Sequence, residues 1–534
     1  MRFIGVLGII ALLALAYAFS TNRKAIKPRI IIWGLSLQLL FAVIILSQSV
    51  LSWIGMIIFA GLLLLYLFAD KVLQKQTWGE ALIPGVVLVL ASIVVIFASY
   101  FLETLGISTI VFYVVLFLYF LTLVLKQKVL VRYLFAVLML TALGILISRG
   151  IYGSVIFEKL AIGVGNFLDI ADQGSEFLFG NLAIEEYFYT DGEFWPGFGF
   201  QFAFSVLPTI IFFSAIMSIL YYMGIMQVIV QMMARFMRWT MGTSGAETLS
   251  CSANIFIGQT EAPLLIKPFL DDMTLSELHA IMVGGFATIA GGVLAGYISM
   301  GVDAGHLIAA SVMAAPAALV VGKMLLPETE ESKTAGDIEL PDVGHADNVL
   351  DAAARGTSDG LKLAVNVGAM LIAFIALIGV INMILGYVDK LIDFQLLGGA
   401  LKEGSTEYKG IFPGSLNTFF GTLFSPIAFL MGVPWKEAMD VGNLLGIKIA
   451  VNEFVAYAEL SRYMAEGQLS PRAITIATYA LCGFANFSSI GIQIGGIGAI
   501  APKRRSELSR IALRAMFAGA TVSWISASIA GILI

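Results

Sequence analysis

Long apolar runs recur along the whole chain and constrain its fold more than any other feature. A helix that crosses the hydrocarbon core of a bilayer needs roughly 20 apolar residues. The apolar residues in these runs are continuous rather than alternating, which indicates helices and not a barrel. We therefore expect an all-α polytopic membrane protein. The runs lie near residues 3–19, 30–48, 53–69, 81–101, 107–125, 131–148, 200–223, 278–300, 306–326, 361–387, 472–498 and 509–532.

The composition agrees with an environment of membrane lipid and argues against several classes of soluble protein. Hydrophobic residues make up 59% of the 534 residues and charged residues only 13%, and the mean hydropathy is +0.93. The net charge of −5 comes without a clustered basic and aromatic face, so we expect no nucleic-acid partner. The cysteines, Cys251 and Cys482, lie in apolar, glycine-rich stretches and read as small core residues.

Basic residues between the runs set the expected topology. The groups within 23–29, 71–75 and 126–132 fall in alternate loops, which the positive-inside rule places in the cytoplasm. The N-terminus is then outside, and the basic loop 503–505 near the C-terminus is again cytoplasmic. The basic group at 23–29 also indicates that the first apolar run is a retained helix rather than a cleaved signal peptide.

Two segments, 241–270 and 436–463, are poor simple spans because polar residues and glycines interrupt them. A carboxylate within a membrane costs roughly 3 kcal/mol or more, so it usually faces a cavity or a partner. Glu261 and Glu453 are therefore candidate site residues, although each could instead bond to backbone N–H groups or to Lys448. Glu247 reads better as a helix cap or as the partner of a basic residue. The polar residues of these segments are Glu247, Asn254, Gln259 and Glu261 in the first, and Asn443, Lys448, Asn452 and Glu453 in the second.

A short sequence repeat follows the two interrupted segments. Gly285-Phe286-Ala287 comes after the first, and Gly483-Phe484-Ala485 comes after the second. By the topology above, the first set of elements starts from the cytoplasm and the second from outside. This order predicts an inverted repeat with two re-entrant hairpins and two discontinuous helices, an arrangement typical of secondary transporters and not of membrane enzymes.

Three longer motifs give the chain a family resemblance. Residues 258–265 read GQTEAPLL, residues 452–457 read NEFVAY, and residues 478–489 read TYALCGFANFSS. In this order they resemble the motifs of concentrative nucleoside transporters, over about 155–534 and the first two spans. The resemblance implies a homotrimer whose protomers each have a scaffold domain and a transport domain with two hairpins.

The resemblance also implies a nucleoside site, position by position. Gln259, Thr260 and Glu261 would serve the base, directly or through water. Glu453, Asn486 and Ser489 would hold ribose hydroxyls, and Val293 and Phe484 would pack against the nucleoside. A carboxylate accepts hydrogen bonds from hydroxyls and an asparagine both donates and accepts, so these residue types suit an uncharged sugar. The hairpins have no arginine cluster, which argues against nucleotides.

For the coupling ion, the resemblance implies a sodium site of neutral oxygen ligands. The side chains of Asn254 and Thr288 and the backbone carbonyls of Ile257 and Ile289 are the matching positions. Ordinary hydrogen bonding between hairpin and helix is the alternative role for these residues. We expect Na⁺ as coupling ion and no organic cofactor, and a proton-coupled nucleoside symporter remains the alternative.

The expected function is symport of nucleosides into the cell with sodium by alternating access, in the plasma membrane or bacterial inner membrane. A membrane-bound enzyme is a remote alternative, since the histidines at 279, 306 and 345 are scattered and form no metal or nucleophile constellation.

The sequence also predicts how the chain is divided. The expected parts are the first two transmembrane helices (1–50), an inserted block of about four extra transmembrane helices (51–150), an interfacial segment and scaffold helix (151–240), the first hairpin and following helices (241–326), a cytoplasmic polar loop (327–360), a scaffold helix and interfacial region (361–435), and the second hairpin and final helices (436–534).

Overall fold

The computed structural model describes residues 2–68, 78–104, 106–125, 127–183, 201–334, 336, 346–402 and 406–534. Within these residues the chain is helical, and an isolated bridge between Leu401 and Tyr408 is its only β pairing. The chain forms two compact units, one of Leu39–Leu160 and one of Met1–Gln38 with Ala161–Ile534. The all-α fold expected from the apolar runs is confirmed.

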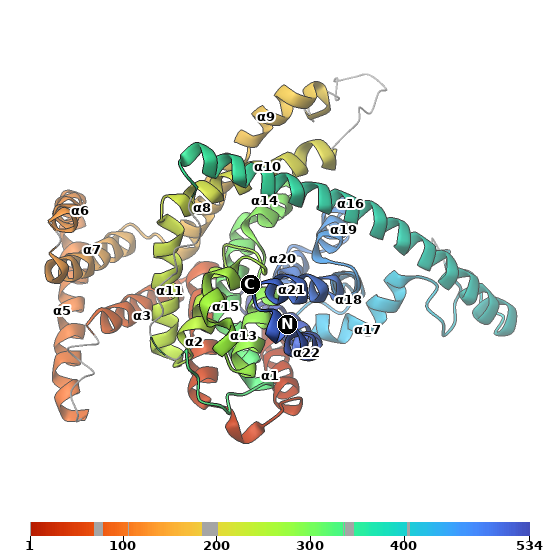
Figure 1. The fold of residues 1–534 in the computed structure, drawn as a ribbon, viewed down its shortest axis with the longest axis horizontal. Helices are drawn as coiled ribbons and strands as arrows, with labels where there is room; N and C mark the ends of the chain where they lie inside the picture. Colours follow the sequence, from red (N-terminus) through yellow and green to blue (C-terminus); the bar gives the residue numbers. More distant parts are fainter. Residues whose placement is uncertain are drawn as a thin grey trace. The chain divides into compact units, whose positions relative to one another are not determined.

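The smaller unit contains the helices expected between residues 51 and 150 (Figure 1). Leu64 and Phe68 pack with Ala136 and Leu140 in its core. Arg149 forms an ion pair with Glu103 at 2.7 Å. The basic residues expected at 71–75 and at 126 lie outside the described residues. The helices are α3 (Val50–Leu67), α5 (Trp78–Thr104), α6 (Ser108–Val124) and α7 (Lys128–Ser148).

The larger unit holds the remaining elements, and α2 and α8 have residues in both units. Its elements are α1 (Arg2–Ala18), η1 (Arg23–Ala25), α2 (Pro28–Leu46), α8 (Gly153–Leu168), α9 (Ile170–Phe179), η2 (Gly180–Ala183), α10 (Phe202–Tyr222), α11 (Ile225–Met241), α12 (Gly245–Ala253), η4 (Ala262–Asp272), α13 (Leu275–Ala287), α14 (Gly291–Ser299), α15 (Ala304–Leu325), α16 (Val349–Asp389), η5 (Lys390–Leu396), α17 (Leu416–Leu430), α18 (Ala438–Ala450), α19 (Glu453–Ala465), α20 (Pro471–Leu481), α21 (Phe487–Ile500), η6 (Pro502–Arg504) and α22 (Arg505–Leu533).

Two sets of elements in the larger unit follow the same order. The first repeat has a hairpin of α12 and η4, a broken helix of α13 and α14, and the long helix α15. The second repeat has a hairpin of α18 and α19, a broken helix of α20 and α21, and the long helix α22. We call 245–272 the first hairpin and 438–465 the second hairpin. The discontinuous helices are confirmed, with breaks at 288–290 and 482–486, and the re-entrant character of the hairpins stays a prediction.

The two helix breaks contact each other through the glycine of the second repeat. Gly483 has a φ of +120°, a conformation that L side chains rarely adopt. A Cβ atom on this residue would lie 2.7 Å from the backbone oxygen of Phe286 and 2.9 Å from that of Ala287. The absence of a side chain at 483 therefore lets the backbone of one repeat approach that of the other.

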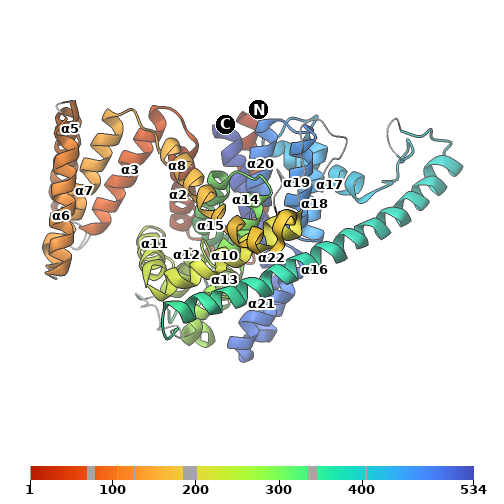
Figure 2. The ribbon, with the colours of Figure 1, turned by 90° about the horizontal axis from the view of Figure 1, so that it is seen from above.

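Helix α16 runs beside α10 and is longer than the sequence indicated (Figures 1 and 2). Its 41 residues begin at Val349, where the Asn348 side chain accepts a hydrogen bond from the N–H of Asp351. The expected polar loop 327–360 is thus wrong in its C-terminal part, which is helical. The Asn348 cap starts this helix before its apolar run begins, so the apolar run alone predicts too short a helix.

Eight helices in the described residues are long and apolar enough to cross a membrane. In the first repeat they include α15 and the combined range Leu275–Ser299, and in the second repeat Pro502–Leu533. The larger unit also supplies Phe202–Tyr222 and Val349–Leu396. This number of apolar helices fits a multi-pass membrane protein.

Candidate functional site

A cavity of about 210 Å³ lies in the larger unit between residues of both repeats and of α16. All eight residues expected to bind substrate line it, although they come from segments far apart in the chain. The wall residues are Gly258, Gln259, Thr260 and Glu261 of the first hairpin, Ala290 and Val293 at the start of α14, Leu363, Val367 and Met370 of α16, Asn452, Glu453 and Phe454 of the second hairpin, and Phe484, Asn486, Ser488, Ser489 and Ile492 around the start of α21.

Glu453 is the buried carboxylate of the second hairpin. Its Oε1 accepts a hydrogen bond from the hydroxyl of Tyr297 at 3.1 Å, and its Oε2 accepts one from the side-chain amide of Asn486 at 2.9 Å. Only 4% of Glu453 is exposed. The side chain of Asn452 caps α19 by accepting from the N–H of Val455, which fixes Glu453 as the first residue of the helix. A carboxylate at a helix N-terminus is favoured by the helix dipole.

Asn486 and Ser489 are positioned by the start of α21. The Asn486 Oδ1 accepts from the N–H of Ser489 at 2.8 Å, which is a helix cap. The same oxygen accepts from the hydroxyl of Ser488 at 2.7 Å. Because its oxygen is used by the cap, the amide of Asn486 is turned toward Glu453. The break in the second broken helix thus sets the direction of two site residues.

Gln259 joins the first hairpin to the second repeat. Its Nε2 donates to the Ser489 hydroxyl at 3.2 Å, and its Oε1 accepts from Gln493 Nε2 at 3.0 Å. Gln493 is fully buried and also donates to the carbonyl of Met282 at 3.1 Å. The orientation of the Gln259 amide is therefore determined by two residues of α21, in the second repeat.

Glu261 differs from Glu453 in both exposure and partners. Glu261 is exposed, and its Oε2 accepts from the backbone N–H of Gly258 at 3.2 Å. Glu261 thus has one backbone hydrogen bond and also lines the cavity, so its role in binding stays a prediction. Glu453 instead bonds to two side chains, and within the described residues it forms no ion pair with Lys448.

The sequence reasoning missed Gln493, Tyr297 and the apolar wall from α16. Gln493 follows Ser489 by four residues and Tyr297 follows Val293 by four residues, so each lies on the same helix face as a predicted residue. That spacing could have identified both. The α16 residues gave no such signal, because one apolar residue in a long apolar helix looks like any other.

The expected cation ligands lie at the junction of the first hairpin and the first broken helix. The hairpin carbonyl of Phe256 accepts from the N–H of Gly291 at 3.1 Å, and the hydroxyl of Thr288 donates to the carbonyl of Gly284 at 2.9 Å. Asn254 is fully buried, and within the described residues neither its Oδ1 nor its Nδ2 has a hydrogen-bond partner. Buried polar atoms are nearly always bonded. The unpaired Oδ1 fits the role of a cation ligand, because the amide oxygen is an acceptor.

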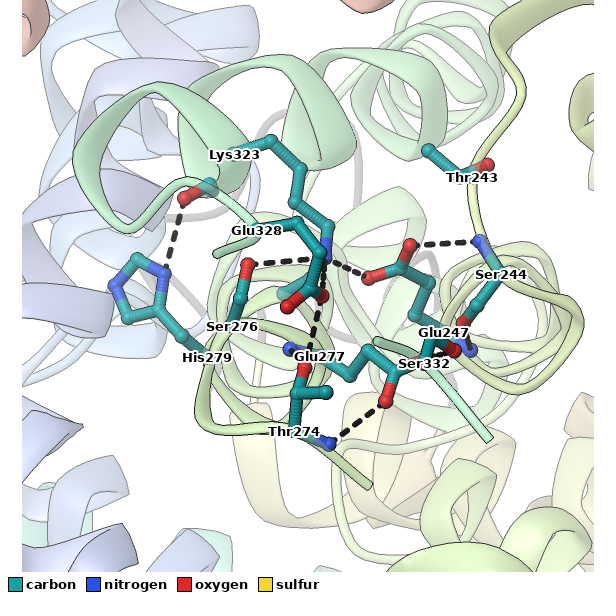
Figure 3. Close-up of polar contacts among 12 residues, drawn as sticks. Thr243, Ser244, Glu247, Thr274, Ser276, Glu277, His279, Lys323, Glu328 and Ser332 are labelled. Carbon is teal, nitrogen blue, oxygen red and sulfur yellow. Dashed lines mark hydrogen bonds and ion pairs between the residues drawn. The ribbon is translucent and has the colours of Figure 1, made fainter. Parts of the chain in front are cut away.

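A separate polar cluster holds the base of the first hairpin (Figure 3). The Glu247 carboxylate accepts from the N–H of Ser244 at 2.8 Å and pairs with the ammonium of Lys323 at 2.7 Å. Lys323 also contacts Ser276 at 3.0 Å and Glu328 at 3.1 Å. The interpretation of Glu247 as a cap and as a partner of a basic residue is confirmed on both counts.

The same cluster includes the cap of α13. Thr274 and Glu277 form a second capping box, with the N–H of Thr274 donating to Glu277 at 2.8 Å (Figure 3). The other carboxylate oxygen of Glu277 accepts from the hydroxyls of Ser332 and Thr334. The segment after α15 therefore ties the N-terminal ends of α12 and α13 together, a structural role away from the cavity.

Comparison with family models gives three matches. Residues 7–70 match "Na+ dependent nucleoside transporter N-terminus", residues 203–304 match "Nucleoside recognition", and residues 306–531 match "Na+ dependent nucleoside transporter C-terminus". Residues 71–202 lie between the matched ranges. The N-terminal match extends past residue 51, so the start of the inserted block at that residue stays a prediction.

Curated relatives include sodium/nucleoside cotransporter 1 of Mus musculus, which is 45% identical over 406 residues. That match covers 73% of this chain and 58% of the mouse protein, so the chain spans less than two thirds of that relative's length. The uncharacterized transporter YutK of Bacillus subtilis (strain 168) is 42% identical over 394 residues, which cover 74% of this chain and 90% of YutK.

Solved structures of the transporter CNTnw have a similar fold. The inward-facing, substrate-bound state matches with a TM-score of 0.70 and 33% identity, over 99% of this chain and 98% of that one. A variant of CNTnw in an outward-facing state matches with a TM-score of 0.72 and 33% identity, over 100% and 97% of the two chains.

Proposed function

This chain belongs to the family of sodium-dependent nucleoside transporters, and from that premise we propose that it is a symporter that moves nucleosides into the cell with sodium by alternating access. The cavity is the observation that carries the proposal. Eight residues chosen from two distant parts of the sequence all line one space of about 210 Å³. Sites for drug-sized ligands occupy about 300–1,000 Å³, so this space suits a smaller ligand such as a single nucleoside.

The polar groups of the cavity support a division of roles. Glu453, Asn486 and Ser489 form one connected wall of acceptors and donors, which suits the ribose hydroxyls. Gln259, Thr260 and Glu261 line the cavity from the first hairpin, where Gln259 donates a hydrogen bond to Ser489. We assign these three residues to the base. Val293 and Phe484 supply apolar contacts to the nucleoside.

The charge of the cavity favours an uncharged ligand. None of the described residues that line it is an arginine or a lysine, and its charged groups are the carboxylates of Glu261 and Glu453. Phosphate groups are normally bound by arginine, lysine or several N–H groups. Nucleosides are therefore favoured over nucleotides as substrates.

Sodium is the proposed coupling ion, bound by the side chains of Asn254 and Thr288 and the carbonyls of Ile257 and Ile289. The unpaired, buried amide of Asn254 supports this assignment. Unwound backbone at a helix break supplies carbonyl ligands for sodium in other transporters. The ion would hold the first hairpin against the break of the first broken helix, next to Gln259.

The names of the matched proteins support the mechanism. Relatives named as sodium/nucleoside cotransporters favour sodium over the alternative of proton coupling. CNTnw is described in both inward-facing and outward-facing states, which agrees with alternating access. A transporter of this kind needs no catalytic group and no organic cofactor, and we assign it none.

We further propose that the protein works as a homotrimer in the plasma membrane or bacterial inner membrane. Large apolar side chains of α16, among them Ile372, Met383 and Tyr387, are exposed in the single chain and suit lipid or a second protomer. The helices within 51–150 form a compact unit of their own, which supports an insertion outside the transport core.

Uptake by the full chain in proteoliposomes tests the proposed function. We expect saturable uptake of radiolabelled uridine or adenosine under an inward sodium gradient, and no concentration of either nucleoside under a proton gradient alone. Uptake driven only by protons would replace sodium coupling with the alternative. An absence of nucleoside uptake under both gradients would contradict transport itself.

A further inference from the structure

The two repeats have different side chains, an asparagine and a lysine, at corresponding positions near their helix breaks. Gly284 directly precedes Gly285-Phe286-Ala287, as Cys482 directly precedes Gly483-Phe484-Ala485. In the first repeat Asn254 lies beside Gly284, since its Nδ2 is 3.3 Å from where a Cβ atom of residue 284 would stand. In the second repeat the ammonium of Lys448 lies beside Cys482, at 3.4 Å from its carbonyl oxygen.

Lys448 occupies the corresponding place in its hairpin. Asn254 directly follows the last residue of α12, and Lys448 lies in the last turn of α18. Both helices are the first arms of their hairpins. Each side chain therefore reaches from the end of a first arm to the C-terminal end of the first half of a broken helix.

The surroundings of the Lys448 ammonium are those of a bound cation. Its Nζ donates to the carbonyl of Ala480 at 2.9 Å, to that of Cys482 at 3.4 Å and to the hydroxyl of Ser523 at 3.2 Å. Lys448 is fully buried, and no carboxylate of the described residues pairs with it within 4.0 Å. Its contacts are three neutral oxygens, two of them at the end of α20.

Helix-end electrostatics explain how a buried charge is tolerated there. The last carbonyls of a helix have no partners within the helix and carry a partial negative charge. A break in the broken helix leaves these carbonyls within the protein interior, where an unpaired polar group is costly. A cation at this point satisfies the carbonyls, and the carbonyls in turn replace the water that the cation has lost.

We propose that the ammonium of Lys448 is a built-in cation of the second repeat, at the point that matches the sodium site of the first repeat. One nucleoside then enters with one sodium ion and not two, and only the first hairpin depends on free sodium. This inference rests on the proposed function. Lys448 does not line the cavity, so it is a positioning residue that holds α18, and with it Glu453, against α20 and Asn486.

The alternative is that Lys448 only tethers α18 by packing and hydrogen bonds. Two substitutions separate the roles. Lys448→Met keeps a long side chain and removes the charge, which leaves no room for an ion. Lys448→Ser removes the charge and empties a space lined by three oxygens, which sodium can enter. Ser523→Ala is the matched control, because it removes one contact and keeps the ammonium.

The experiment measures uridine binding to the purified full chain over a range of sodium concentrations, together with the ratio of sodium to uridine taken up by proteoliposomes. For the unmodified chain we expect one sodium per uridine. Both Lys448 variants should lose at least roughly tenfold in uridine affinity at low sodium. High sodium should restore uridine affinity in Lys448→Ser alone. The Hill coefficient for sodium should rise from about one in the unmodified chain to about two in Lys448→Ser.

Several results would overturn the built-in cation. An uptake ratio of two sodium ions per uridine in the unmodified chain would do so without any variant, which keeps the test decisive if the variants fail to fold. If both variants fold, lose the same uridine affinity and do not recover it at high sodium, Lys448 only holds α18 in place and is not a substitute for a cation. A chain that binds no uridine at any sodium concentration would instead contradict the proposed function, so the two failures are distinguishable.

Discussion

The two repeats have the same order of elements but satisfy their polar groups differently. In the second repeat, the hairpin lysine and the buried carboxylate are both fully engaged, Lys448 with three oxygens and Glu453 with two side chains. In the first repeat, the buried amide of Asn254 has no partner within the described residues, and Glu261 is exposed. Lys448 and Glu453 thus have partners within the protein, whereas the side-chain amide of Asn254 has none among the described residues. We therefore expect the proposed sodium ion to act on the first hairpin rather than on the second.

The largest expected effect compares the carboxylates of the two hairpins. Glu453→Gln places an amide where Tyr297 and Asn486 both donate, so it should weaken uridine binding by about 3 kcal/mol. Glu261→Gln should cost less, because Glu261 is exposed and bonds to one backbone N–H. Calorimetric titration of both purified variants measures the difference. Equal losses, with both proteins intact by size-exclusion chromatography, would contradict the contrast between the repeats.

A double substitution in the first repeat tests its dependence on sodium. Asn254→Ala with Thr288→Ala removes both side chains that we propose as sodium ligands and should abolish most of the coupling between sodium and nucleoside, about 2 kcal/mol. The affinity for uridine would then respond weakly to sodium, while the affinity without sodium stays near that of the unmodified chain. Titrations at several sodium concentrations measure this slope. A variant that retains the full slope would place the ion elsewhere.

Glycine substitutions at matching positions sharpen the comparison further. Gly483→Ala forces a side chain into a positive φ and against the backbone of Phe286, so it should lower stability by about 2 kcal/mol. At Gly285 the added Cβ meets the Gln493 amide at 2.7 Å and the Gln259 Cβ at 2.9 Å. Gly285→Ala should therefore reduce uridine affinity more than stability. Thermal unfolding and binding titrations on both variants would show whether the two effects separate in this way.

The smallest expected effect concerns the bond that links Gln259 to the second repeat. Gln493→Met keeps the side-chain length and removes the donor to Gln259 Oε1, which should weaken uridine binding by about 1 kcal/mol. Because Gln493 bonds to Gln259, which we propose binds the base, ribose and deoxyribose analogues should lose affinity equally. A loss of affinity confined to one of the two sugars would show that Gln493 acts on the residues proposed to bind ribose.

The sequence could identify the cavity residues because local rules position many of them. Asn452 and Asn486 cap helices, so the motifs that contain them also fix Glu453 and Ser489. Their roles in binding stay predictions. The partners of Lys448 could not be predicted, since Ala480 and Ser523 are distant in the chain and offer only a backbone carbonyl and a common hydroxyl. The early start of α16 could not be predicted from its apolar run, because Asp351, Arg355 and Asp359 interrupt the apolar pattern in its first turns.

The close contact between the two helix breaks has a consequence for how this chain can diverge. The backbone against which Gly483 packs leads within two residues to Thr288, and Gly483 itself precedes Phe484 and Asn486. A substitution that shifts either break would move the other, because no side chain separates them. We therefore expect the preference of the proposed ion site and that of the proposed nucleoside site to change together. Natural variants with an altered coupling ion should carry paired changes on both sides of the crossing rather than a single replacement.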